Sequence, residues 1–356
     1  MTTIRSFHTD HGAEFTTRAG RAVPAHYGRP ERAHRAVRNG VGVFDYPSDV
    51  VIVTGDDRVE FLDNAVTNKV SAAPGTGCLA LLLTPNGRIR LEMYVYTMAE
   101  RLLLFLPPGA APDLLADWRE KVFIQDVTFE DATEQYAVFG VHGPNATEKL
   151  ASVVAGVGIP DERFRIVEAT IADASVSIVP TDAPCGEESF DVICQSDDAE
   201  AVFDSLLTGG YSAIPFGLDT WESLTLEAGN LLFDDIVDRI PNVVGMRSAL
   251  DFEKGCYVGQ EVVSRLENRG QHNDEVVGLS LEAVPEPGQP VEDDGESIGE
   301  IIRAGYSPIL DGPIAIALVD VDHASELTVN GQIATVHSLP FVEGSALSGR
   351  LPTYRA

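Results

Sequence analysis

The chain has 356 residues, enough for two or three domains that each bury a hydrophobic core. Hydrophobic residues make up 44% of the chain without forming a long apolar run, which argues against a transmembrane helix, and the first residues lack the apolar stretch of a secretory signal. The four cysteines are not spaced as metal ligands, so we expect a reduced, cytoplasmic protein with no metal site; they are Cys78, Cys185, Cys194 and Cys256.

The net charge is −30, from 55 acidic and 25 basic residues, and only four residues are lysine. Such a surface repels itself and nucleic acid in dilute buffer, but in molar salt the Debye length falls to about 3 Å. We interpret the acid-rich, lysine-poor composition as adaptation to a salt-accumulating, halophilic cell, an archaeon. An acidic surface for a basic partner is the alternative, which the even spread of acidic residues along the chain disfavours.

Two segments share one predicted layout of strand, helix, antiparallel strands, helix and strand. The first has strands at 50–54, 79–83, 89–96, 101–106 and 122–129, with helices at 57–65 and 112–118. The second has strands at 136–141, 164–171, 174–180, 189–194 and 211–215, with helices at 145–154 and 198–208. The repeated order predicts two α+β units with antiparallel sheets.

From residue 276 onward, short apolar runs alternate with turns, and no helical pattern is found. The runs are at 276–281, 299–303, 314–321, 326–329 and 332–338, with a surface loop expected at 284–290. This pattern predicts a small β-barrel. We therefore expect an α+β protein in three parts, which are an N-terminal segment with the first unit (1–133), the second unit (134–270) and a C-terminal β-barrel (271–356).

The stretch 254–265, Lys-Gly-Cys-Tyr-Val-Gly-Gln-Glu-Val-Val-Ser-Arg, predicts a cysteine at the start of a helix. Cys256 would face the positive end of the helix dipole with Lys254 nearby, and both effects lower a thiol pKa from its usual value of about 8.5. Glu261 and Arg265 are four residues apart and can pair across one helical turn. A buried, inert cysteine in a tight loop is the alternative interpretation.

This string resembles the signature of the YgfZ family, which comprises folate-binding relatives of the glycine-cleavage T-protein (GcvT), an aminomethyltransferase. Other segments resemble the T-protein itself; they include Val53-Thr54-Gly55, His142-Gly143-Pro144, Leu226-Glu227-Ala228-Gly229 and Leu339-Pro340-Phe341. The resemblance implies tetrahydrofolate as the cofactor and a role in assembling or maintaining iron–sulfur enzymes, which would be the client proteins.

The same resemblance implies the site residues. The T-protein segment Gly-x-Ile-x-Asp-Asp-Leu falls on residues 87–93, where Leu91-Glu92 replaces the acidic pair, so Glu92 is the remaining catalytic acid. Asp191 and Glu227 fall on or beside family segments, and each is a candidate for binding the pterin ring. A carboxylate can accept a pair of hydrogen bonds from the adjacent N–H groups of such a ring.

Within the signature, Cys256 and Lys254 are catalytic candidates, and Lys254 could instead hold the glutamate tail of the folate. The further folate-binding candidates of the signature are Tyr257, Gln260 and Arg265.

Three functions stay open at this point. The first is a YgfZ-like folate-binding maintenance protein, the second a folate-dependent aminomethyltransferase or related demethylase, and the third an acidic module that binds proteins and has lost folate. The T-protein tyrosine is replaced by Pro184 and its arginine by Thr225, so we favour the first.

Overall fold

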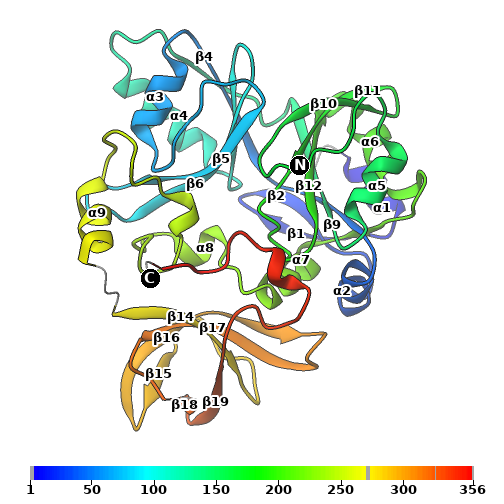
Figure 1. The fold of residues 1–356 in the computed structure, drawn as a ribbon. Coiled ribbons are helices and arrows are strands. Elements are labelled where there is room, and N and C mark those ends of the chain that lie inside the picture. The colour runs from blue at the N-terminus through cyan, green and yellow to red at the C-terminus, as the bar shows by residue number, and fades with distance from the viewer. Residues whose placement is uncertain (1–3, 270–272, 325, 355–356) are drawn as a thin grey trace.

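The computed structural model describes residues 4–269, 273–324 and 326–354. It confirms an α+β fold with antiparallel sheets and a closed C-terminal barrel. Two sheet-containing units lie side by side, and the barrel lies below both of them (Figure 1).

The first sheet has the strand order β5-β6-β7-β4-β8, and all its neighbours are antiparallel. Its elements are β4 (Asp49–Thr54), α3 (Arg58–Ala65), β5 (Thr76–Leu83), β6 (Ile89–Thr97), β7 (Leu102–Leu106), α4 (Ala111–Lys121) and β8 (Thr128–Asp131). Leu91, Met93 and Val95 of β6 pack in one apolar cluster with residues of both helices. Because side chains alternate along a strand, Glu92 and Tyr94 face the opposite side, toward the second sheet.

The second sheet has the order β10-β11-β12-β9-β3-β13, in which only β3 and β13 are parallel. Its elements are β3 (Gly42–Asp45), β9 (Tyr136–His142), α5 (Ala146–Val153), β10 (Val167–Ile171), β11 (Ala174–Pro180), β12 (Ser189–Gln195), η1 (Ser196–Asp198), α6 (Ala199–Thr208) and β13 (Ile214–Phe216). Phe190 and Val192 of β12 pack against α5 and α6, so Asp191 between them faces the first sheet. β3 precedes the first sheet in sequence but pairs in the second sheet.

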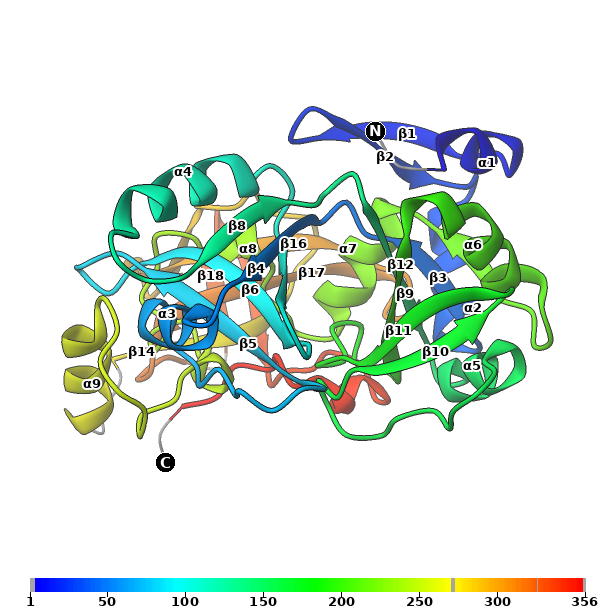
Figure 2. The ribbon, with the colours of Figure 1, turned by 90° about the horizontal axis from the view of Figure 1, so that it is seen from above.

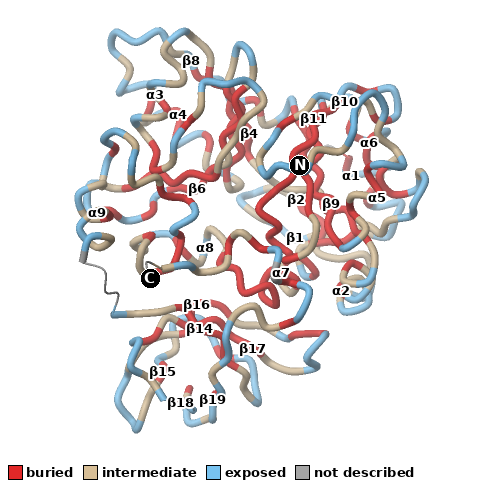
Figure 3. The backbone as a smooth tube through the Cα atoms, in the orientation of Figure 1, coloured by how far each residue is buried: buried red, intermediate tan, exposed pale blue. Residues whose placement is uncertain are grey.

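The two sheets share an apolar cluster. It joins Ile52, Tyr96 and Phe105 of the first sheet to Val138 and Ile193 of the second. Figure 3 shows that buried backbone runs through both sheets, while the outer loops are exposed. The connection from the second sheet to the barrel contains α7 (Leu218–Glu227), α8 (Phe233–Ile236), η2 (Arg247–Ala249) and α9 (Gln260–Arg269).

The N-terminal segment contains helices and strands that the sequence analysis did not predict. They are α1 (Arg5–Asp10), β1 (Glu14–Arg18), β2 (Arg21–His26) and α2 (Pro30–Arg38). β1 and β2 form a two-stranded antiparallel hairpin, which lies outside both large sheets at one side of the molecule (Figure 2).

The barrel has the strand order β14-β17-β16-β15-β18-β19 and closes through the β14–β19 pair. Its strands are β14 (Asp274–Ser280), β15 (Pro290–Asp293), β16 (Glu296–Ser307), β17 (Gly312–Asp320), β18 (Glu326–Val329) and β19 (Gln332–His337). β15 is absent from the sequence prediction because it is short and begins with proline, which is accepted at the first position of a strand. After β19 the chain returns to the two sheets through η3 (Ser345–Leu347).

Several predicted boundaries differ from the structure, and two of the differences matter most here. The strand expected at 122–129 begins only at Thr128, and the preceding apolar pair Phe123-Ile124 lies exposed in a loop. The helix of the signature begins at Gln260, so Cys256 lies in the loop before the helix and not in its first turn. No described helix has the length and apolar character needed to cross a membrane.

Candidate functional site

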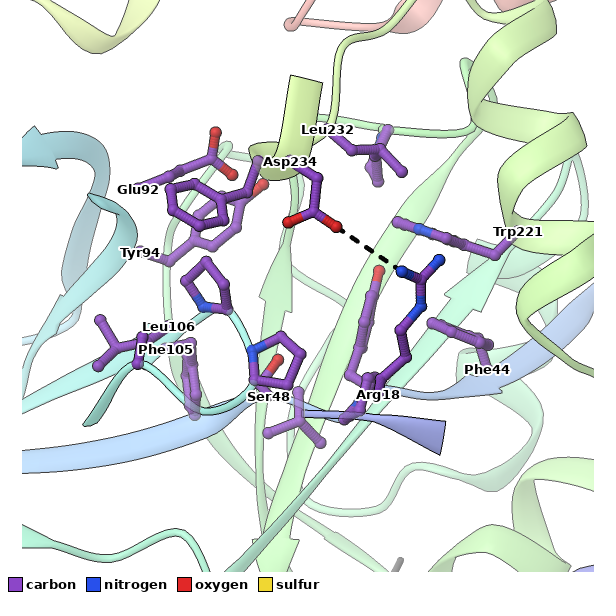
Figure 4. A pocket seen from close by; sticks show the side chains of 18 of the residues that line it. Arg18, Phe44, Ser48, Glu92, Tyr94, Phe105, Leu106, Trp221, Leu232 and Asp234 are labelled. Carbon is purple, nitrogen blue, oxygen red and sulfur yellow. Dashed lines mark ion pairs between the residues drawn. The ribbon is translucent and has the colours of Figure 1, made fainter. Parts of the chain in front are cut away.

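A cavity of about 540 Å³ lies between the two sheets, and α7, α8 and the C-terminal tail complete its wall (Figure 4). Five carboxylates and two guanidinium groups line it; they are Glu92, Asp182, Asp191, Glu222, Asp234, Arg18 and Arg350. These residues come from segments far apart in sequence. The fold therefore gathers charged side chains from distant segments around one cavity.

Asp191 is the least satisfied of these groups. Its side chain is buried, and its Oδ1 atom has no hydrogen-bond partner among the described residues. Burial, and then the charge of Asp182, raise the pKa of the Asp191 carboxyl well above its usual range. A buried polar atom without a protein partner is costly, so this oxygen is available to accept a hydrogen bond from a group inside the cavity.

The charge of Asp191 acts on three buried tyrosine side chains, which are Tyr46, Tyr94 and Tyr96. Burial, and then the charge of Asp191, raise the pKa of Tyr46 and Tyr96 well above the usual value, so both stay neutral. The Tyr96 hydroxyl is also buried without a partner among the described residues. Tyr46 is held by His142, whose Nε2 lies 3.0 Å from the tyrosine hydroxyl, and burial lowers the pKa of His142 to about 3.

Glu92 lies in the same cavity but, unlike Asp191, it is paired with a cation. Nη2 of Arg350 donates a hydrogen bond of 2.7 Å to Glu92 Oε2. Nη1 of Arg350 donates to the Tyr94 hydroxyl at 2.9 Å and to Asp182 Oδ2 at 3.3 Å. Burial disfavours the charge of Arg350, but Glu92, Tyr94 and Asp182 outweigh this effect and raise its pKa. Glu92 is thus an ion-paired carboxylate.

An aromatic wall stands on the other side of the cavity. The rings of Phe44 and Trp221 are stacked with centroids 5.0 Å apart and planes 4° from parallel, and Tyr46 meets Trp221 edge-on at 5.3 Å. Flat aromatic surfaces of this kind suit a planar heterocycle. The cavity therefore combines a stacking surface with an unsatisfied carboxyl group.

Glu227, expected to contact the pterin, does not line this cavity. It is fully buried, and Oε2 accepts hydrogen bonds from His34 Nε2 at 2.7 Å and from Arg38 Nη2 at 3.2 Å. Oε1 accepts from the Ser307 hydroxyl at 2.5 Å and from the Ile309 amide at 3.1 Å. Burial raises the pKa of Glu227, but the bonds and charge of His34, with those of Ser307 and Arg38, lower it overall. The carboxylate connects α2, α7 and the barrel, which is a structural role.

The signature residues do not line the cavity either. The ammonium of Lys254 is fully buried and donates to the carbonyl oxygens of Asp63, Val66 (2.8 Å) and Asn68 (2.9 Å). Its nitrogen also lies 5.6 Å from the ring centre of Tyr257, which is itself buried. These contacts leave Lys254 engaged with protein groups and tie the signature loop to the end of α3.

The rest of the signature lies near the surface. Cys256 and Arg265 are exposed, and no ion pair between Glu261 and Arg265 is found among the described residues. Gln260 donates only a long bond of 3.5 Å to the carbonyl of Gly255. The structure explains why position 259 is glycine. The φ angle of Gly259 is +84°, and an added Cβ would lie 2.7 Å from the Thr84 carbonyl oxygen. The backbone at Gly259 therefore lies close against the β5–β6 turn.

Sequence reasoning did not find several residues of the cavity, above all Arg350, Asp182, Trp221 and Arg18. Arg350 is 258 positions from its partner Glu92, and nothing local in the tail marks it as part of a site. Within the described part of the chain, no cluster of histidine, cysteine and carboxylate side chains could hold a metal ion.

The fold consists of two sheet-containing units around one central cavity, followed by a C-terminal barrel. Residues 4–254 match the GCVT N-terminal domain, and residues 275–343 match the glycine cleavage T-protein C-terminal barrel domain. The chain therefore belongs to the GcvT family, as the T-protein part of the sequence resemblance predicted; the narrower YgfZ assignment stays a prediction.

Relatives match over nearly the whole chain. The aminomethyltransferase of Streptomyces avermitilis is 30% identical over 336 residues, which cover 91% of this chain and 90% of the relative. The aminomethyltransferase of Cutibacterium acnes is 30% identical over 374 residues, which cover 97% and 100%. The crystal structure of glycine cleavage system aminomethyltransferase T from Bartonella henselae is similar in fold, with a TM-score of 0.84, 24% identity and 99% of each chain covered.

Proposed function

We propose that the central cavity binds a reduced folate and that the chain uses this folate in one-carbon transfer of the aminomethyltransferase kind. The observation that carries the proposal is Asp191, a buried carboxyl group with an unpartnered oxygen in a cavity that also has an aromatic wall. The proposal is further supported by the relatives, which are named aminomethyltransferases.

Each side chain has a distinct part in this proposal. Asp191 pairs with the adjacent N–H donors of a pterin ring. Trp221, backed by the stacked ring of Phe44, offers the flat surface against which the ring stacks. Glu92, ion-paired to Arg350 at 2.7 Å, supplies negative charge where positive charge develops on a reacting amine. A bound tetrahydrofolate would supply the nitrogen that accepts the one-carbon unit.

Calorimetric titration with tetrahydrofolate in molar KCl tests the binding step. We expect Asp191→Asn to weaken binding by at least about tenfold, because it replaces an acceptor for paired hydrogen bonds. Asp197→Asn is the matched control, since it removes a carboxylate from an exposed position just after the same strand. Absence of tetrahydrofolate binding by the unaltered chain would reject the proposal and leave a folate-free protein-binding module.

A second candidate is the YgfZ-like role in maintaining iron–sulfur enzymes in the cytoplasm. It is favoured by the signature around Cys256, the one exposed cysteine of the four, outside the folate cavity. Burial raises the pKa of each of the other three thiols, Cys78, Cys185 and Cys194, to about 12. Of the four, Cys256 is therefore the thiol open to client proteins.

Two variants separate the candidates. In a glycine-cleavage assay with an aminomethylated carrier protein, the transferase proposal expects turnover that survives Cys256→Ala and is lost in Glu92→Gln. If the chain has the maintenance role, we expect no turnover in this assay. We then expect the chain to restore the activity of a damaged iron–sulfur enzyme, and Cys256→Ala to abolish this effect. Cys78→Ala controls for the loss of a thiol, because Cys78 is half-buried and its thiol pKa is raised.

A further inference from the structure

We infer that Arg18, in the N-terminal hairpin, binds the carboxylate tail of the folate and so selects a ligand with an anionic tail over a bare pterin. This inference rests on the proposed folate binding and adds a residue to it. Arg18 lies at the wall of the cavity, beside Trp221 and Phe44 (Figure 4).

The wall of the cavity is mostly negative, so a positively charged side chain is needed to bind an anionic tail there. Five of the seven charged side chains in the wall are carboxylates, in a chain of net charge −30. An anionic group entering this field is repelled unless a positive group meets it. Arg350 cannot do so, because its side chain is only 3% exposed and is bound to Glu92 and Asp182. Arg18, with 42% of its side chain exposed, is the remaining cation of the described wall.

The hairpin holds Arg18 in this place. Arg18 ends β1, and Ala19 and Gly20 form the turn with positive φ values of 47° and 76°. Arg21, which begins β2, is bound to the carboxylate of Asp49. The tip of the hairpin also packs closely on the loop after β7, where a Cβ added at Gly109 would lie 2.7 Å from the Cβ of Ala19. Arg18 is thus presented by an anchored turn.

The present partners of Arg18 can be displaced. Its Nη2 lies 2.6 Å from Glu222 Oε1 and its Nη1 lies 3.7 Å from Asp234 Oδ2 (dashed line in Figure 4). The side chains of Glu222 and Asp234 are 45% and 81% exposed. Exposed ion pairs contribute only about 0–1 kcal/mol, and a guanidinium offers five donors in a geometry that suits a carboxylate. A tail carboxylate can therefore take the place of Asp234.

The test compares two ligands, tetrahydrofolate and a tetrahydropterin without the benzoylglutamate tail, by calorimetry in molar KCl. We expect Arg18→Gln to weaken tetrahydrofolate binding by about fivefold and to leave tetrahydropterin binding unchanged. Arg32→Gln, at an exposed position of α2 outside the cavity wall, removes the same charge and is the control. Asp234→Asn removes the competing carboxylate and should strengthen tetrahydrofolate binding by about twofold, again without an effect on tetrahydropterin.

The outcomes separate the inference from the proposed function. If the unaltered chain binds neither ligand, the folate proposal and this inference both fail. If it binds both but Arg18→Gln weakens neither, or weakens both equally, the inference fails and folate binding stands. Thermal melting of the variants shows whether each is folded. Asp234→Asn is an independent test, because it should change tetrahydrofolate affinity in the opposite direction even if Arg18→Gln fails to fold.

Discussion

Two acidic residues in the central cavity differ in environment more than in chemistry. Glu92 shares a hydrogen bond of 2.7 Å with Arg350, whereas Asp191 has a buried oxygen without a partner and faces the charge of Asp182. Removing one carboxylate should therefore have the opposite effect on stability from removing the other. Loss of Glu92 leaves a buried guanidinium less compensated, while loss of the Asp191 charge relieves the folded state.

Asp191→Asn should change the pH dependence of stability. Because the folded-state pKa of Asp191 is raised, its protonated form stabilises the folded chain at low pH, and this contribution is lost as the pH rises from about 3.8 through the raised value. At neutral pH the variant should be more stable than the unaltered chain, because the asparagine amide brings no charge into the buried position. Below about pH 3, where the carboxyl is protonated in both the folded and the unfolded chain, the difference should vanish.

Denaturant unfolding in molar KCl at several pH values measures this difference. Asp197→Asn, at an exposed position, should follow the unaltered chain at every pH. If Asp191→Asn were less stable at neutral pH, with a deficit that disappeared on acidification, the carboxylate would be stabilising and our assignment of its environment would be wrong.

Among the elements, the signature loop serves as an anchor between α9 and the first unit. Lys254 binds three carbonyl groups at and just beyond the end of α3. Next to it, the Thr67 hydroxyl donates to the Ala249 carbonyl at 2.7 Å, and the Asp251 amide donates to the Thr67 carbonyl at 3.0 Å. The conspicuous lysine of the sequence is therefore accounted for by helix termination and loop attachment.

Lys254→Met should destabilise the fold without changing the folate cavity. The variant keeps the aliphatic stem but leaves buried carbonyl groups unpaired, so we expect a loss of about 3 kcal/mol in the free energy of unfolding. Lys69→Met is the matched control, because Lys69 also pairs with Asp63, at 3.4 Å, but is 60% exposed and should lose less than about 0.5 kcal/mol. Denaturant unfolding measures both, and tetrahydrofolate affinity should be unchanged. A tenfold loss of affinity in a folded Lys254→Met protein would instead favour a direct role in binding.

Local patterns in the sequence were sufficient to predict individual helices and strands. They did not predict which side chains from distant segments contact one another. The runs at 89–96 and 189–194 were sufficient to predict β6 and β12. The family segments placed Glu92 and Asp191 on these strands, and both residues line the cavity. Arg350 follows a barrel in which no pattern indicates a return to the sheets. Glu227 is identified by a local segment, but its burial among His34, Arg38 and Ser307 depends on three elements far apart in the chain.

At the scale of the whole molecule, charge is the dominant feature. Acidic residues exceed basic ones by 30, and the ion pairs that the structure describes neutralise only some of them. The remaining acidic side chains repel one another, and salt shortens the range of this repulsion. The Debye length is about 10 Å at 0.1 M and about 3 Å at 1 M. The folded chain brings these charges closer together than the unfolded chain does, so screening should favour folding.

We therefore expect the melting temperature to rise steeply with KCl and the chain to lose its structure in dilute buffer. Circular dichroism across a KCl series measures the transition, and sucrose at matched osmolality is the control. Sucrose also favours burial of surface but does not screen charge, so it should restore folding much less than KCl does. Equal rescue by sucrose would mean that general exclusion from the surface, and not repulsion between carboxylates, controls stability. Full stability without salt would contradict the halophilic interpretation of the composition, because the excess of 30 acidic residues would then be tolerated without screening.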